Sequence, residues 1–273
     1  MRPIAEAYKD FPILHKEHNG HRVIYLDSGA TAQIPQAVID RVVEHMTQRN
    51  GNPHRGSHIL AIEASEDYEN ARDRVVKFIN AREREEVVFT RNSTESMNLI
   101  AHSYGLHNVK KGDKIVITVA EHHANLVTWQ YVAEQTGATL EYMYLDEHGH
   151  LKDGEINKID ENTKIVAFAH VSNVLGMEFP VKELTEKAHS VGAIVVLDGA
   201  QSTPHKKIDV QALDCDFFVF SGHKMCASQG IGVLYGKREL LEDMPPFLLG
   251  GDMIEYVKEQ TATFNELPYK FEA

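Results

Sequence analysis

Short apolar runs alternate with amphipathic segments between about residues 86 and 220 of this 273-residue chain. Runs of about four to eight apolar residues are typical of buried strands, and apolar positions three or four residues apart are typical of helices. Strands that alternate with helices favour a layered α/β fold, because each helix carries the chain back to start the next parallel strand. The sequence therefore predicts a mostly parallel sheet covered by helices.

The predicted elements follow this alternation along the chain. Strands are predicted at residues 87–90, 114–119, 139–145, 164–170, 193–197 and 217–220. Helices are predicted at residues 36–48, 64–79, 94–107, 125–135 and 181–191, with a shorter one at 154–159. A further strand at 231–235 follows its predecessor too closely for a crossover helix, so we expect it to be antiparallel.

Composition excludes several classes of partner. The net charge of −12 disfavours nucleic acid, whose phosphate backbone would repel the chain. The two cysteines, Cys215 and Cys226, indicate no disulfide framework. No stretch approaches the ~20 apolar residues of a membrane helix, and the N-terminus lacks the apolar core of a signal peptide. We therefore expect a cytoplasmic protein that binds neither nucleic acid nor membrane.

Polar clusters follow five of the predicted strands, at the edge of the sheet where α/β proteins bind ligands. The clusters are Asn92-Ser93-Thr94-Glu95, Glu121-His122-His123, His170-Val171-Ser172-Asn173, Asp198 with Gln201, and Ser221 with His223 and Lys224. Each has a plain alternative explanation as a helix cap, a surface histidine or a turn. Zinc is disfavoured, because adjacent histidines point in different directions and no third ligand stands at a helical spacing. Taken jointly, the clusters suit a single cofactor.

The pairing of Lys224 with Asp198 indicates which cofactor that is. Lysine is a poor nucleophile at its ordinary pKa of ~10.4, so a reactive lysine needs a special environment. Pyridoxal 5'-phosphate (PLP) requires a lysine for covalent attachment and a carboxylate beside its ring nitrogen. Hydroxyls and free amides at a helix N-terminus near Thr94 would bind its phosphate, and Asn173 is placed to bond the ring hydroxyl. The sequence therefore predicts a PLP site.

Longer motifs carry a resemblance to a known family. The chain resembles the SUF-type (group II) cysteine desulfurases, which belong to the class V aminotransferase fold group. The matching segments are Tyr25-Leu26-Asp27-Ser28-Gly29-Ala30-Thr31, Asn52-Pro53-His54-Arg55-Gly56, Glu121-His122-His123-Ala124-Asn125, Ser172-Asn173-Val174-Leu175-Gly176, Asp198-Gly199-Ala200-Gln201, Ser221-Gly222-His223-Lys224 and Gly250-Gly251-Asp252-Met253-Ile254. The fold implied is the large domain of an aspartate aminotransferase-like, PLP-dependent transferase.

The resemblance also implies a role for each site residue. Lys224 would bond to PLP and move the substrate's Cα proton, and Asp198 would pair with the ring nitrogen. His123 would stack on the ring and assist acid–base steps, and Gln201 would bond the ring oxygen. The phosphate would be bound by Thr94, Ser221 and His223.

The activity implied is the conversion of L-cysteine to L-alanine, with the sulfur leaving as a protein persulfide for iron–sulfur cluster assembly. Relatives are homodimers and pass sulfur to an acceptor protein of the SUF type. Two alternatives stay open. One is a selenocysteine lyase or cysteine sulfinate desulfinase, and the other is a non-catalytic PLP-binding remnant.

Two departures from the family pattern bear on activity. Family members continue past Ala273 into a small C-terminal domain with the nucleophilic cysteine and a carboxylate-binding arginine. We accordingly expect an N-terminal arm at residues 1–20, a PLP-binding large domain at 21–258, and the start of the crossover to the C-terminal domain at 259–273. The segment Ala227-Ser228-Gln229-Gly230 also stands where relatives carry Gly-Pro-Thr-Gly, which alters the turn after Lys224. The expectation is a chain that holds PLP but turns over cysteine poorly.

Overall fold

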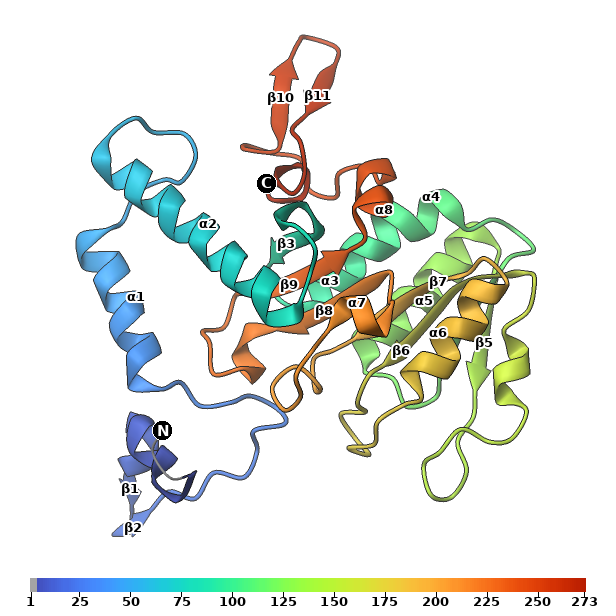
Figure 1. The fold of residues 1–273 in the computed structure, drawn as a ribbon, viewed down its shortest axis with the longest axis horizontal. Coiled ribbons are helices and arrows are strands. Elements are labelled where there is room, and N and C mark those ends of the chain that lie inside the picture. Colours follow the sequence, from blue (N-terminus) through green and yellow to red (C-terminus); the bar gives the residue numbers. More distant parts are fainter. Residues whose placement is uncertain (1–3) are drawn as a thin grey trace.

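A seven-stranded sheet forms the centre of the computed structural model, which describes residues 4–273 (Figure 1). Its strands lie in the order β3-β9-β8-β7-β6-β4-β5. Their bounds are β3 Val87–Thr90, β4 Lys114–Thr118, β5 Thr139–Met143, β6 Thr163–Ala169, β7 Ile194–Asp198, β8 Phe217–Ser221 and β9 Gly232–Gly236. Residues 1–3 of the predicted N-terminal arm lie outside the described residues.

Most neighbouring strands of this sheet are parallel. The pairs β5–β4, β4–β6, β6–β7 and β7–β8 are parallel, whereas β9 is antiparallel to both β8 and β3. The predicted α/β class, the seven predicted strands and the antiparallel direction of the last one are therefore confirmed. Because six strands share one direction, the carboxyl ends of β3, β4, β6, β7 and β8 meet at one edge of the sheet.

Helices cover both faces of the sheet. They are α1 Gln36–Gln48, α2 Ile59–Ile79, α3 Ser93–Ile100, α4 Leu106–Asn108, α5 His123–Thr136, α6 Val181–Ser190, α7 Val210–Leu213 and α8 Arg238–Asp243, with a π-helical segment η4 at Ala101–Gly105. Short 3-10 turns are η1 Ile4–Asp10, η2 Pro12–His15, η3 Arg84–Glu86, η5 Glu155–Lys158, η6 Gly222–Lys224 and η7 Tyr269–Phe271.

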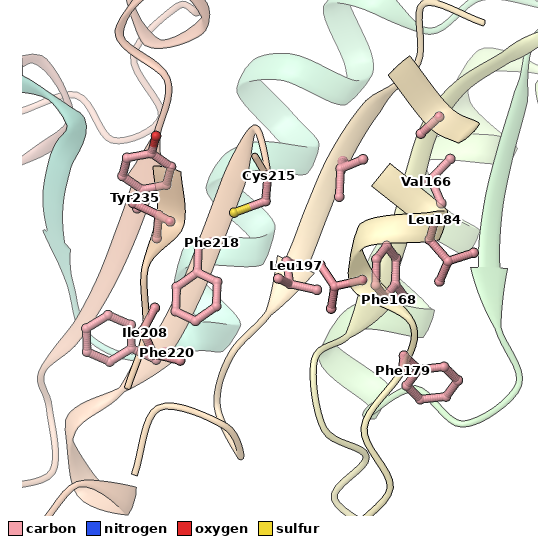
Figure 2. Close-up of a cluster of buried hydrophobic side chains, with 14 of the residues drawn as sticks. Val166, Phe168, Phe179, Leu184, Leu197, Ile208, Cys215, Phe218, Phe220 and Tyr235 are labelled. Atoms are coloured by element: carbon pink, nitrogen blue, oxygen red, sulfur yellow. The ribbon is translucent and has the colours of Figure 1, made fainter. Parts of the chain in front are cut away.

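Two apolar cores result, one on each face. Trp129 of α5 and Met97 of α3 pack on one face with Ile117 of β4. The other core joins Leu184 of α6 to strand residues such as Phe168 and Phe218 (Figure 2). Cys215 lies fully buried in this second core, and its place there rules out contact with a ligand at the sheet edge.

The N-terminal part stands apart from the sheet (Figure 1). It contains a small hairpin, β1 Glu17–His18 with β2 His21–Arg22, and helix α1, none of whose residues is buried. The apolar side chains of α1 are exposed, and Met46 is 69% accessible. Helix α2 buries Ala61, Ala64, Arg72 and Ile79.

The C-terminal part returns to the sheet. A hairpin of β10 Ile254–Val257 and β11 Ala262–Phe264 protrudes from the molecule, and the chain then packs beside α2 and β3 (Figure 1). There the Glu272 carboxylate accepts hydrogen bonds from both terminal nitrogens of Arg72 at 2.8 Å, from the Tyr68 hydroxyl and from the Phe89 N–H. We call these four residues the Arg72–Glu272 clamp.

None of the helices in residues 4–273 combines the length and the apolar composition needed to span a bilayer.

Candidate active site

A hollow lies at the sheet edge where the carboxyl ends of the strands meet. It is a cavity of about 830 Å³. Its wall is built from the turns that follow β3, β4, β6, β7 and β8, and from residues 27–30 of the N-terminal part. The lining residues are Asp27, Gly29, Ala30, Arg91, Asn92, Ser93, Thr94, His122, Ala169, Val171, Asn173, Asp198, Ala200, Gln201, Ser221, His223, Lys224, Gln229 and Gly230.

Lys224 and Asp198 enter this cavity from neighbouring strands. Lys224 ends the turn η6 after β8, and Asp198 is the last residue of β7. Burial lowers the pKa of the Lys224 amine, although the Asp198 charge opposes this. Burial likewise raises the pKa of the Asp198 carboxyl, against the hydrogen bond from the Ala200 N–H at 2.9 Å. Burial therefore shifts both groups toward their neutral forms.

The turn after Asp198 depends on a glycine. A Cβ added at Gly199 would lie 2.0 Å from the ring of Phe218 on β8, so no other residue fits without movement of that ring. Gly199 thereby lets the Asp198 turn pack directly on the neighbouring strand.

The first turn of helix α3 leaves a backbone donor available at the cavity. The first N–H groups of a helix have no partner within it. Here the Ser93 N–H donates to Ser221 Oγ at 2.8 Å, the Glu95 N–H to Asn92 Oδ1 at 2.9 Å, and the Ser96 N–H to the Asn92 carbonyl. Among the described residues, this leaves the Thr94 N–H without a protein acceptor. An anion can bind there together with the hydroxyls of the first turn.

The Glu121-His122-His123 motif brings one of its two histidines to the cavity. His122, not His123, lies on the cavity wall. His122 is the N-cap of α5, whereas His123 is its first helical residue. Adjacent side chains at a helix start point in different directions, so the motif predicted the right turn but not the right residue. Burial lowers the pKa of His122, which favours the neutral imidazole.

The N-terminal residues on the wall are bound to the opposite side of the cavity. Gln201 Nε2 donates to the Gly29 carbonyl at 2.8 Å. The His223 carbonyl accepts hydrogen bonds from the Ala32 N–H at 2.9 Å and from Thr31 Oγ1 at 3.2 Å. These bonds hold residues 27–32, which we call the rim segment, across the mouth of the cavity. The sequence motif contained this segment, but no pattern in it predicted contact with residues so distant.

The turn after Lys224 holds the departure from the family pattern. Gln229 and Gly230 line the cavity, and Cys226 adopts φ = 61°, in the left-handed region that disfavours side chains. Burial raises the pKa of the Cys226 thiol, so less of it is present as the nucleophilic thiolate.

Seven of the eight predicted site residues therefore share one cavity. They are Thr94, Asn173, Asp198, Gln201, Ser221, His223 and Lys224. The exception is His123. Ser93, His122 and the rim segment are additions that the sequence contained within its motifs without singling out.

Comparisons with known proteins place the chain in one family. The aminotransferase class V family model matches residues 24–273. A probable cysteine desulfurase from Synechocystis sp. is 51% identical over 271 residues, which cover 98% of this chain and 64% of the relative. A probable cysteine desulfurase from Halalkalibacterium halodurans is 53% identical over 268 residues, which cover 98% of this chain and 66% of the relative. The chain thus spans about two thirds of the length of these curated relatives.

Solved structures give the same result. The cysteine desulfurase CsdA from Escherichia coli superposes with a TM-score of 0.90 at 40% identity, over all of this chain and 67% of that one. The apo cysteine desulfurase from Thermococcus onnurineus NA1 superposes with a TM-score of 0.93 at 41% identity, over all of this chain and 66% of that one.

Proposed function

The chain belongs to the class V aminotransferase family, and we propose that it forms the PLP-binding part of a cysteine desulfurase of the SUF type. The observation that carries the proposal is the entry of Lys224 and Asp198 into one cavity from neighbouring strands. The similarity to cysteine desulfurases in sequence and in structure supports the choice of substrate.

The cavity wall fits PLP at both of its ends. The unpaired Thr94 N–H, with the hydroxyls of Ser93 and Ser221, suits the phosphate. At the other end, Asp198 has one oxygen bonded to the Ala200 N–H, which leaves the second for a protonated ring nitrogen. His223 would add a further donor to the phosphate, and Gln201 and Asn173 would bond the ring oxygen.

The chemistry that PLP supplies when bound is an electron sink for the charge left at the substrate Cα. Lys224 would attach the cofactor, and burial lowers the pKa of its amine, which favours the neutral, proton-accepting form of Nζ at the sheet edge. Asp198 would hold a proton on the ring nitrogen by remaining charged beside it. We assign the stacking and proton-transfer role to His122 in place of His123.

A substrate comparison tests this function against its nearest alternative. Alanine release would be measured with L-cysteine, selenocysteine and cysteine sulfinate, each in the presence of PLP and a thiol. We expect slow alanine release from cysteine, and we expect that release to require Lys224. Release from only the other two substrates would favour a selenocysteine lyase or cysteine sulfinate desulfinase. If absorbance shows that PLP binds but no alanine is released from any of the three substrates, the non-catalytic PLP-binding remnant would be favoured.

We propose that the chain forms a homodimer through its N-terminal part. The apolar face of α1 is unusually exposed, with Val43 52% and Met46 69% accessible, and Leu26 nearby in the sequence is 92% accessible. Exposed apolar patches of this kind mark interaction surfaces. Sedimentation should give a dimer that Val43→Glu with Met46→Glu converts to monomer. Val127→Glu on exposed α5 is the matched control and should leave the dimer intact. A monomer of the unmodified chain at high concentration would contradict the proposal.

Transfer of sulfur to a SUF-type acceptor for iron–sulfur cluster assembly, and a cytoplasmic location, belong to the same proposal and rest on the family resemblance and the sequence. Incubation with sulfur-labelled cysteine and candidate acceptor proteins, followed by measurement of the label on each acceptor, would test the sulfur transfer.

A further inference from the structure

Glu121 is a buried carboxyl group directly behind the cavity wall. It precedes His122 in the chain and is only 8% exposed. Its Oε1 shares a hydrogen bond with the Thr118 hydroxyl of β4 at 2.5 Å, and its Oε2 accepts one from Asn125 Nδ2 of α5 at 2.6 Å. The Glu121 side chain therefore ties the end of β4 to the first turn of α5. The predicted site residues do not include it.

Asn125 holds both members of the Glu121-His122 pair. Its side-chain amide binds Glu121, and its backbone N–H donates to the His122 carbonyl at 2.8 Å. The indole N–H of Trp129 donates to Asn125 Oδ1 at 2.8 Å, which turns the NH2 group of Asn125 toward Glu121. All of Glu121, Asn125 and Trp129 are buried, so none of these bonds competes with water.

The ring of His122 is fixed by a separate bond. His122 Nδ1 accepts a hydrogen bond from the Ala124 N–H at 3.1 Å. An accepting Nδ1 requires the neutral imidazole to carry its proton on Nε2. The backbone of residues 121–125 thus determines both where the ring stands and which nitrogen carries the proton.

We propose that Glu121, held by Thr118 and by the Asn125–Trp129 pair, is a positioning residue that sets His122 on the cavity wall for contact with the cofactor. This inference rests on the PLP site proposed above. It assigns no contact between Glu121 and the cofactor, since Glu121 does not line the cavity.

The charge state of Glu121 is compatible with this role. Burial raises the pKa of the Glu121 carboxyl to about 8, and the Asp198 charge raises it further, while the bonds from Thr118 and Asn125 oppose the rise. A mostly neutral Glu121 at pH 7 adds no second negative charge beside Asp198. It also means that glutamine, which is neutral and of the same shape, can keep both hydrogen bonds, because the Thr118 hydroxyl can accept as well as donate.

The test compares PLP affinity and the absorbance of bound PLP in matched variants. Glu121→Leu removes both hydrogen bonds, and we expect it to weaken PLP binding about tenfold and to shift the band. Glu121→Gln should stay within about twofold of the unmodified chain. Trp129→Phe removes only the indole N–H and should weaken binding a few-fold, which keeps the test informative if Glu121→Leu fails to fold. Glu86→Leu, at another buried glutamate remote from the cavity, is the control.

A double-mutant cycle with His122→Ala separates positioning from general stabilisation. If Glu121 acts through His122, Glu121→Leu should have less than a twofold further effect on PLP affinity in the His122→Ala background. Equal effects in both backgrounds would overturn the inference. So would Glu121→Leu and Trp129→Phe variants that bind PLP like Glu86→Leu, even though the unmodified chain binds it. Failure of the unmodified chain to bind PLP would instead refute the proposed function, and this inference with it.

Discussion

The pKa values in two buried clusters of charged residues are shifted by different causes. In the Arg72–Glu272 clamp, the carboxylate accepts four hydrogen bonds, and its partners raise the pKa of the fully buried Arg72 despite the cost of burial. In the cavity, burial dominates instead, so that the pKa of Asp198 is raised and that of Lys224 is lowered. No hydrogen bond or ion pair joins Lys224 to Asp198 in residues 4–273.

The difference separates a structural site from a functional one. A buried pair whose members satisfy each other stabilises the chain where it is, but has nothing left with which to bind a ligand. A buried acid and a buried amine held apart are costly in the empty protein, and a ligand with complementary charges removes that cost on binding. Burial alone does not distinguish the two clusters. The presence or absence of an internal partner does.

Replacing Lys224 tests the cavity side of the comparison with the largest expected effect. Lys224→Ala should abolish covalent attachment of PLP, measured by borohydride reduction followed by peptide mapping. The control is Lys270→Ala. Burial also lowers the pKa of Lys270, but its amine already donates to the carbonyls of Leu241 and Glu242. Labelling of Lys270, or retained labelling in Lys224→Ala, would show that a lowered pKa and not the cavity decides which lysine reacts.

Replacing Arg72 tests the clamp side. Arg72→Met should lower the free energy of unfolding by about 3–5 kcal/mol, because the Glu272 carboxylate would remain buried without its cation. Denaturant unfolding followed by circular dichroism measures this. The exposed pair of Arg84 with Asp73 gives the matched control, and Arg84→Met should cost no more than about 1 kcal/mol. Equal losses in the two variants would mean that the clamp contributes no more than a surface ion pair.

Asp198→Asn should affect stability and ligand binding in the opposite way to a change in the clamp. Removal of the unpaired carboxylate should leave the stability of the apo protein unchanged or raise it, yet weaken PLP binding at least about tenfold through loss of a charge-assisted bond. Asp216 is the control carboxylate, since it is buried but bonded to His189 and Lys237. Asp216→Asn should do the opposite, with lower stability and unaltered PLP affinity. A loss of stability in Asp198→Asn would show that Asp198, like the clamp residues, stabilises the fold.

A further prediction concerns the pH dependence of stability that Glu121 causes. Its pKa is about 8 in the folded chain and about 4.5 when unfolded, so the folded state retains the proton. Its contribution is therefore full below pH 4.5, declines as the pH rises toward 8, and is constant above that. Relative to the unmodified apo protein, Glu121→Gln should gain about 3–4 kcal/mol of stability between pH 5 and pH 8, because each pH unit between the two pKa values changes the stability by about 1.4 kcal/mol. A difference that does not change with pH would show that Glu121 is ionised throughout.

The sequence predicted most of the fold and most of the site for one physical reason. Parallel strands bring their carboxyl ends to one edge, so residues such as Thr94, Asp198 and Lys224 meet wherever each strand is correctly located. What failed depended on finer geometry. Whether His122 or His123 faces the cavity is decided by the residue at which α5 begins, and helix ends are the least predictable boundaries.

Contacts between distant parts of the chain were likewise beyond local patterns. Arg72 and Glu272 are 200 positions apart, and neither lies in a motif that names the other. The helix at residues 36–48 was predicted, but the amphipathicity of a helix does not say what covers its apolar face. Only the structure shows that α1 lies away from the sheet and that none of its residues is buried.

The rim segment has a consequence for the order in which the protein matures on the ribosome. The Gly29 carbonyl can accept its hydrogen bond only after Gln201, 172 positions later, has been synthesised. Thr31 can donate to the His223 carbonyl only after His223, 192 positions later, has been synthesised. At about 5–20 residues per second, translation needs roughly 10–40 s to make that stretch. The mouth of the cavity is thus formed from the earliest part of the nascent chain but closes among the last, after the strands that support it have been synthesised. The cavity therefore cannot be complete before His223 has been synthesised, and Lys224, which also lines it, follows directly in the chain.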